Sequence, residues 1–291
     1  MRKALYMVCA SALFAACSSS SHQSVENGAI VYDIAVSSLV KTSANAVVYD
    51  IEPAVWAIDA EDGDVFMDDM ALVRQDDMLW STESGLNWPD YSLEQYLYSP
   101  MGRAGFSPEG GICFADYRLD EGCQLYYTEQ LDTKVDANSR GIVSVVMKNA
   151  LCAVRFYACS SMPSYAKFII RKVEFKGVYT AGSFNSLPTA QWTLDRESAR
   201  DIGCFDSTYA ASEYPALMAD RTMMIPQEGT VELRVVCDVD ADGIVLDNQE
   251  YECKIKVDWK PGKIYDYVIR AYGESDMKVV VEYFKDAGSG L

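Results

Sequence analysis

An acidic run near the end of the chain contains residue types that bind metal ions. Asp238, Asp240 and Asp242 alternate along the sequence and Gly243 follows them, which matches the first half of an EF-hand calcium loop. The twelfth position of such a loop is Gln249, and an amide cannot supply the bidentate carboxylate that calcium takes there. The favoured interpretation is therefore an acidic hairpin tip, with a calcium site as the alternative. No other metal site is predicted.

Cysteines are a second group with reactive side chains. The sequence has nine, and seven follow residue 17, an odd number that cannot all pair within one chain. Because these cysteines lie among apolar neighbours, free thiols packed as small hydrophobes are favoured. The alternative is a disulfide between Cys237 and Cys253, which face each other in a hairpin symmetric about residue 245. The seven are Cys113, Cys123, Cys152, Cys159, Cys204, Cys237 and Cys253.

The sequence contains few sets of residues that could act together in catalysis. His22 is the only histidine, so a Ser/His/Asp triad and a histidine-activated cysteine within a folded domain are excluded. A pair of carboxylates could hydrolyse a glycosidic bond, but no pair stands out among the many acidic residues. We therefore expect no enzyme and no cofactor.

Tryptophans give an alternative binding chemistry. Their rings stack on sugars in some proteins, although they serve more often as anchors of a core or an interface. Exposed rings would favour a surface protein that binds glycan or host protein. The five tryptophans are Trp56, Trp80, Trp88, Trp192 and Trp259.

The first residues of the chain have the pattern of an export signal. Arg2 and Lys3 precede an apolar run that is too short to span a bilayer and ends in small residues before Cys17. This ending resembles a bacterial lipobox, in which the cysteine is acylated, for example with palmitate, and becomes the new N-terminus. Several acyl chains anchor a protein stably, since each buried methylene adds about 0.8 kcal/mol. Cys17 is therefore the predicted site of lipidation.

The net charge of the chain excludes one class of partner. The formal charge is −18 and becomes −20 when Arg2 and Lys3 leave with the signal peptide. Such a chain repels nucleic acid, so no nucleic-acid partner is expected. The predicted membrane contact is the N-terminal lipid.

Period-two alternation of apolar and polar residues dominates the rest of the chain. Residues 251–259 alternate strictly, and in residues 231–237 the side chains of Glu232 and Arg234 face away from Val231, Leu233, Val235 and Cys237. Such alternation is typical of antiparallel strands with one buried face. Residues 55–58 and 65–67 flank an Asp-Gly turn, which is a hairpin signal. No stretch of the sequence shows the long 3.6-residue apolar repeat of an amphipathic helix. The sequence therefore predicts an all-β fold with minor helix.

Polar stretches divide the chain. We expect a lipoprotein signal peptide over 1–16, a flexible serine-rich tether over 17–28, an N-terminal β-sandwich domain over 29–133, a C-terminal β-sandwich domain over 134–286, and a tail over 287–291.

Short motifs follow one another in a fixed order over residues 50–270. They include a tryptophan-proline pair and an aromatic residue followed by Ser-Pro. Together they resemble the fimbrillin family of lipoproteins, the subunits of type V pili in Gram-negative anaerobes. The motifs lie at residues 55–58, 87–90, 93–100, 124–128, 146–151, 173–184, 192, 223–227 and 259–265.

This resemblance implies two tandem transthyretin-like antiparallel β-sandwiches and assembly by strand donation. A protease removes the first strand of a subunit, and a neighbouring subunit inserts a strand into the groove that remains. The implied function is that of a pilus subunit or anchor that contributes to cell adhesion. Its partners would be other fimbrial subunits, and its location the outer membrane, the cell surface or the fimbrium.

Two segments fit the strands of such a mechanism. The candidate removable strand covers residues 29–40, and its apolar residues are Ala29, Ile30, Val31, Ile34, Val36 and Leu39. The candidate donor strand covers residues 278–284 with Val279, Val281 and Tyr283, although an ordinary final strand is slightly favoured there. Family maturation commonly cuts after arginine, but Lys41 is the only basic residue between the candidate strand and Arg74. Lys41 is therefore the candidate cleavage site, and an uncut chain would act as an anchor.

Overall fold

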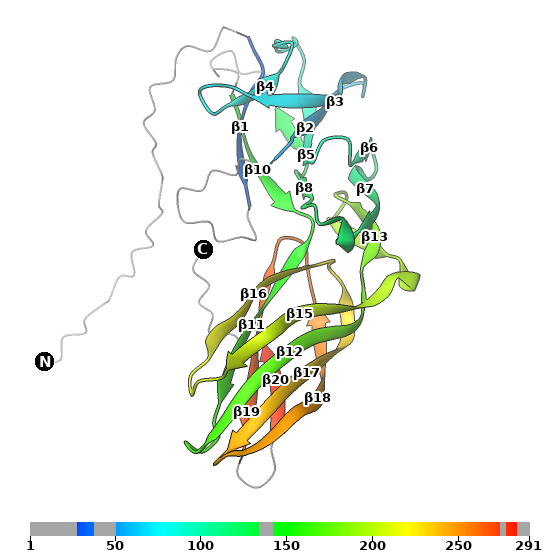
Figure 1. The fold of residues 1–291 in the computed structure, drawn as a ribbon. Coiled ribbons are helices and arrows are strands. Elements are labelled where there is room, and N and C mark those ends of the chain that lie inside the picture. Colours follow the sequence, from blue (N-terminus) through cyan, green and yellow to red (C-terminus); the bar gives the residue numbers. More distant parts are fainter. Residues whose placement is uncertain (1–27, 38–50, 134–141, 274–277, 284–291) are drawn as a thin grey trace, which may run out of the picture.

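The computed structural model of the chain describes residues 28–37, 51–133, 142–273 and 278–283. Within these residues the secondary structure is β throughout, apart from the short 3-10 helices η1 (Leu119–Glu121) and η2 (Arg196–Ser198). Figure 1 shows the strands gathered into an N-terminal part and a C-terminal part. The prediction of an all-β fold with several sheets is confirmed.

The N-terminal part is a sheet that closes on itself. Each strand pairs with the next along the sheet, and the pairing of the last strand with the first completes a ring among the described residues. In ring order the strands are β2 (Ala54–Asp59), β3 (Val65–Arg74), β4 (Trp80–Thr82), β1 (Val31–Val36), β10 (Ile142–Asn149), β8 (Tyr126–Tyr127) and β5 (Leu93–Ser99), and β9 (Leu131–Thr133) also pairs with β5. This closed arrangement differs from the two-layer sandwich that the sequence predicts, because alternation alone does not reveal which edges pair.

A second, four-stranded sheet packs against the outside of this ring. It is built from β6 (Gly105–Ser107), β7 (Gly111–Arg118), β13 (Ala181–Asn185) and β14 (Gln191–Leu194). Trp56 and Tyr98 of the ring stack with ring centroids 4.8 Å apart and share a core with Phe114 and Phe184 of this sheet. The two N-terminal sheets are therefore joined by an aromatic core.

The C-terminal part is a sandwich of two four-stranded sheets around a second core (Figure 1). One sheet contains β16 (Ala216–Met224), β11 (Cys152–Ser160), β19 (Ile264–Tyr272) and β20 (Lys278–Tyr283); the other contains β15 (Ala199–Ala210), β12 (Ala166–Tyr179), β17 (Glu228–Ala241) and β18 (Ile244–Asp258). Trp259 fills this core, where its ring meets Phe175 at a centroid distance of 5.2 Å and its Nε1 donates to the Tyr267 hydroxyl at 2.9 Å. The predicted alternation places Leu233 and Val235 of β17 and Ile255 and Val257 of β18 in this core.

The N-terminal part includes strands that lie beyond the predicted domain boundary in the sequence. β10 belongs to the N-terminal ring, although the predicted boundary lies at residue 133, before this strand. β13 pairs with β7 of the N-terminal part, although it lies between β12 and β15 of the C-terminal sandwich in sequence. The chain therefore enters the sandwich at β11, and the polar stretch at 134–141 connects two strands of the first domain.

Candidate functional site

The first strand of the described chain lies inside the N-terminal sheet and not at its edge. β1 pairs in parallel with β10, from Val31 opposite Ile142 to Val36 opposite Met147. On its other side β1 pairs antiparallel with β4, where Tyr32 lies opposite Trp80. Without β1, the edges of β4 and β10 would lose their backbone partner, and the ring would open at this position.

The side chains of β1 alternate between the core and solvent. Ile30 and Tyr32 are fully buried, Ile34 and Val36 are partly buried, and Asp33 is exposed. The buried ones pack with residues of β4, β5 and β10 in the core of the ring. Removing this strand would therefore uncover an apolar groove. Of the residues assigned to the removable strand, Ile30, Ile34 and Val36 contact this core, and Ala29 and Val31 lie in the same segment outside it. Leu39 and the candidate cleavage residue Lys41 lie outside the described residues.

One buried hydrogen bond fixes the position of β1. The Tyr32 hydroxyl donates to the Gln95 Oε1 atom on β5, and neither residue is exposed to solvent. Burial raises the pKa of the Tyr32 hydroxyl far above its ordinary value, so this group remains a donor. Sequence analysis did not single out Gln95. The available signal was a glutamine at a core position of an otherwise apolar, aromatic strand.

The candidate donor strand is the edge strand of a C-terminal sheet. β20 pairs only with β19 among the described strands, from Tyr267 opposite Tyr283 to Tyr272 opposite Lys278. Val279 is buried in the sandwich core, Val281 is partly buried, and Tyr283 is 52% exposed. The structure thus places this segment as an ordinary final strand, the interpretation that was slightly favoured.

Solved structures of Bacteroides proteins share this arrangement over most of their length. A fimbrial protein of Bacteroides vulgatus aligns with a TM-score of 0.59 at 14% identity, covering 89% of this chain and 98% of that one. A candidate cell adhesion protein of Bacteroides uniformis aligns with a TM-score of 0.54 at 11% identity, covering 88% of this chain and 98% of that one. A candidate cell adhesion protein of Bacteroides ovatus aligns with a TM-score of 0.52 at 12% identity, covering 89% of this chain and 96% of that one.

The chain has the fold of these Bacteroides proteins. The resemblance to fimbrillins is confirmed at the level of the fold, with a fimbrial protein among its structural neighbours. No protein-family model matches the chain, and no curated protein matches its sequence.

The cysteines in this fold are not placed as the disulfide prediction requires. Cys237 lies opposite Gln249, and Cys253 lies opposite Leu233. The predicted symmetry about residue 245 is wrong because Asp242 and Gly243 form a tight two-residue turn, with φ angles of 50° and 82°. A bulge after Cys237 shifts the register once more. All the described cysteines are free thiols.

The acidic hairpin tip also lacks a metal-binding geometry. The Asp238 carboxylate accepts from Arg171 Nε at 2.6 Å and from the Asn248 backbone N–H at 2.9 Å. These two donors lower the pKa of Asp238, with the backbone hydrogen bond acting most strongly. Asp240 accepts from the Gly243 backbone N–H at 3.3 Å. The pairing of β17 with β18 up to Ala241 opposite Ile244 places Asp242 and Gly243 at the tip of a hairpin, which is the favoured interpretation of this run.

Buried thiols lead to a testable expectation about reactivity. Burial raises the pKa of Cys204 and of Cys237 to about 12 each, and the thiolate is the reactive form. At pH 8 we expect iodoacetamide to alkylate both more than about 100-fold more slowly in the folded protein than in urea. Mass spectrometry of the labelled peptides measures this, with half-buried Cys113 as the comparison. Equal alkylation rates with and without urea would contradict the burial of these two thiols.

The tryptophans do not form a sugar-binding platform. Trp56, Trp80 and Trp259 are buried, and Trp88 and Trp192 pack against the two N-terminal cores. The prediction that such residues more often anchor cores is therefore the one the structure supports. Exposed aromatic rings of the described residues are tyrosines on separate elements, including Tyr91, Tyr214 and Tyr283.

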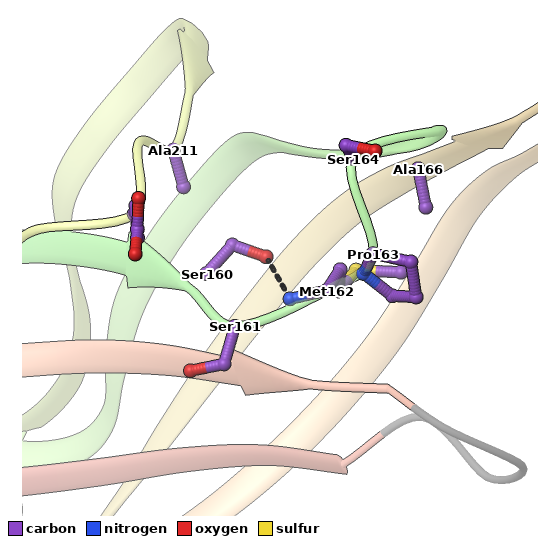
Figure 2. Close-up of a pocket in the computed structure, with 8 residues that line it drawn as sticks. Ser160, Ser161, Met162, Pro163, Ser164, Ala166 and Ala211 are labelled. Carbon is purple, nitrogen blue, oxygen red and sulfur yellow. Dashed lines mark hydrogen bonds between the residues drawn. The ribbon is translucent and has the colours of Figure 1, made fainter.

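A shallow pocket lies where β11 turns into β12 in the C-terminal sandwich (Figure 2). The Ser160 Oγ atom accepts a hydrogen bond from the Met162 backbone N–H at 3.2 Å and is thereby held in the turn. Glu213 is the only acidic residue in the lining, so this pocket contains no carboxylate pair of the glycosidase type. Its lining residues are Ser160, Ser161, Met162, Pro163, Ser164, Ala166, Ala211 and Glu213.

Within the described part of the chain, the only helical elements are single 3-10 turns, and no helix has the length and apolarity to cross a bilayer.

Proposed function

We propose that this chain is a non-enzymatic pilus subunit or anchor that assembles by β-strand donation and contributes to adhesion. The observation that carries the proposal is the internal position of β1, between β4 and β10, with Tyr32 and Ile30, the residue that precedes the strand, fully buried. Removal of such a strand leaves an open apolar groove with unpaired backbone edges, which is a site for an added strand. The name of a fimbrial structural neighbour supports the same role.

The remaining parts of the proposal concern location and partners. Cys17 would carry the lipid that anchors the chain at the outer membrane or cell surface. The partners would be other fimbrial subunits, and the transthyretin-like character implied by the family resemblance would apply to the C-terminal sandwich. Capture of glycan or host protein through exposed aromatic residues is not favoured, because the tryptophans pack against cores and the exposed tyrosines lie on separate elements.

Cleavage after Lys41 tests the proposal. We expect a lysine-specific protease to convert the mature protein from monomers into polymers, because the cut frees β1 to leave the ring. Electron microscopy and size-exclusion chromatography measure the outcome, with Lys41→Gln as the matched control that lacks this cut. Protein that has lost residues up to 41 and still remains monomeric would overturn strand donation. A chain that resists the cut but carries lipid would instead fit an anchor.

A further inference from the structure

Exposed apolar side chains gather at one end of the C-terminal sandwich. The turn between β17 and β18 lies at the end of the sandwich that points away from the N-terminal part (Figure 1). Directly after this turn, Ile244, Val245 and Leu246 are 71%, 51% and 53% exposed. Tyr165, which is 57% exposed, lies beside them, because its carbonyl oxygen accepts a hydrogen bond from the Asp242 backbone N–H at 3.2 Å. These four apolar residues form the apolar tip, and such a contiguous exposed group marks an interaction site.

A bulge in β18 places Leu246 on the inner face of the sandwich. Between the opposite pairs Cys237–Gln249 and Val239–Leu246, β18 contains one residue more than β17. Opposite residues of an antiparallel pair point to the same face, and Val239 is buried in the sandwich core. Leu246 nevertheless remains half exposed. The inner face of this hairpin therefore keeps uncovered apolar surface that a partner can bury.

The backbone edge of β18 is open to a further strand. β18 is the last strand of its sheet and pairs with β17 alone among the described strands. Such an edge presents unpaired backbone groups to another chain, and charged side chains commonly protect it. Lys254 and Lys256 carry charges in the second half of β18, whereas residues 244–246 carry none. The first half of β18 therefore combines an open edge with apolar side chains, which is what an added strand requires.

The charge around the apolar tip is acidic. Asp240 and Asp242 precede residues 244–246 in the hairpin, and Asp247 follows them. One lysine, Lys167 on β12, lies opposite Asp240. Among the described residues, the ion pairs of this hairpin use other carboxylates, those of Asp238, Glu250 and Asp258. The three aspartates and one lysine leave an excess of negative charge, which attracts a basic partner and repels a second copy of this chain with its formal charge of −18.

We propose that the apolar tip is a docking site for an extended, basic segment of another protein, which adds as a strand to the edge of β18. Apolar side chains of the partner would cover Ile244 and Leu246, and its basic side chains would pair with Asp242 and Asp247. Backbone hydrogen bonds would supply part of the affinity, and the alternating side chains the specificity. The inference goes beyond strand donation, because it requires neither cleavage nor the loss of β1, so its failure leaves the proposed function standing.

A short basic peptide tests this docking site. The probe is a fluorescein-labelled peptide in which lysine alternates with valine over about seven residues, the length of an ordinary strand, and fluorescence anisotropy measures its binding to the uncut protein. We expect the double variant Ile244→Ser, Leu246→Ser to weaken binding at least about tenfold, because two apolar contacts are lost. The matched control is Val65→Ser, Val73→Ser, because these residues are 63% and 44% exposed on β3 of the N-terminal ring. Equal affinities of the two double variants would overturn the docking site.

Charge and backbone contributions are tested separately. We expect Asp242→Asn, Asp247→Asn to weaken binding about fivefold at low salt and less at high salt, because salt screens exposed charges. Asparagine tolerates the φ of 50° at position 242, and Asp76→Asn, Asp90→Asn is the control at exposed sites of the N-terminal part. A peptide with proline at its central position lacks one backbone N–H and is expected to bind about tenfold more weakly. Equal losses in the two asparagine variants, or full affinity of the proline peptide, would overturn the added strand.

Hydrogen exchange locates the bound probe. We expect the backbone amides of residues 244–250 to exchange about tenfold more slowly when the peptide is bound, because the added strand protects the edge of β18. Residues 65–74 of β3 are the reference segment, whose exchange rate is expected to stay constant. Protection confined to other strands would overturn the inference. Protection of the apolar tip by vesicles of phosphatidylcholine but not by the peptide would assign it to a lipid surface and overturn the inference as well.

Discussion

Replacement of Tyr32 by alanine is expected to lower the free energy of unfolding of the N-terminal part by about 3–5 kcal/mol, the range found for large aromatic side chains in cores. Tyr32 is fully buried, and its hydroxyl donates to Gln95. The substitution therefore creates a cavity and removes a buried hydrogen bond at once. Urea unfolding followed by tryptophan fluorescence measures the change, since Trp80 lies opposite Tyr32 in the adjacent strand.

An exposed tyrosine supplies the control. Tyr214 is 73% exposed in the connection between β15 and β16, so Tyr214→Ala is expected to change the free energy of unfolding by no more than about 0.5 kcal/mol. Similar losses for the two variants would mean that β1 contributes little to the core of the ring. That result would also weaken the groove on which strand donation depends.

The position of β1 has a consequence for how a pilus subunit could be kept inactive before assembly. While β1 remains in the ring, its backbone covers the edges of β4 and β10, and its side chains fill the core between them. An open edge of this kind invites pairing with other chains. Under the proposed function, the same strand would stabilise the unassembled protein and prevent premature association, and its release would couple assembly to cleavage.

Local patterns predicted individual strands well. The alternation of residues 231–237 and 251–259 identified β17 and β18, and the Asp-Gly turn after residue 58 identified the hairpin of β2 and β3. Each of these signals involves neighbours in sequence, where side-chain period and turn chemistry decide the structure. The aromatic segment that contains Tyr96 is likewise a strand, β5, as its composition favours.

Long-range pairing was not predictable in the same way. The ring closes because β2 pairs with β5, and β13 joins β7 across the domain boundary. Alternation states which face is buried but not which strand lies alongside, so a ring and a sandwich give the same pattern. The predicted register of β17 and β18 was wrong for a more local reason. The turn length and one bulge differ from the predicted hairpin, so each residue lies opposite a different partner than predicted. Gln95 escaped notice because its partner, Tyr32, is 63 residues away.

The second large effect is expected from Asp266→Asn in the C-terminal sandwich. Asp266 on β19 accepts from both Arg155 Nε and Nη2 of β11, each at 2.6 Å, and the two side chains are only 9% and 14% exposed. Arg221 of β16 lies nearby: burial lowers its pKa most strongly, the charge of its ion-pair partner Asp220 raises it, the Arg155 charge lowers it and the Asp266 charge raises it. The Asp266 carboxylate thus pairs with one arginine that is largely removed from water and adds to the effect of Asp220 on a second.

Loss of this charge should therefore cost about 3 kcal/mol or more, because a buried ion left without its partner keeps its desolvation penalty. Urea unfolding followed through Trp259 measures the cost in the sandwich that contains it. Glu129→Gln is the matched control, since Glu129 pairs with Lys148 where the two side chains are 61% and 47% exposed, and such a pair contributes about 0–1 kcal/mol. Equal losses in the free energy of unfolding for the two variants would mean that water screens Asp266 as fully as it screens Glu129. A selective loss would show that β19, the strand that holds β20, is fixed to β11 by charge as well as by its backbone.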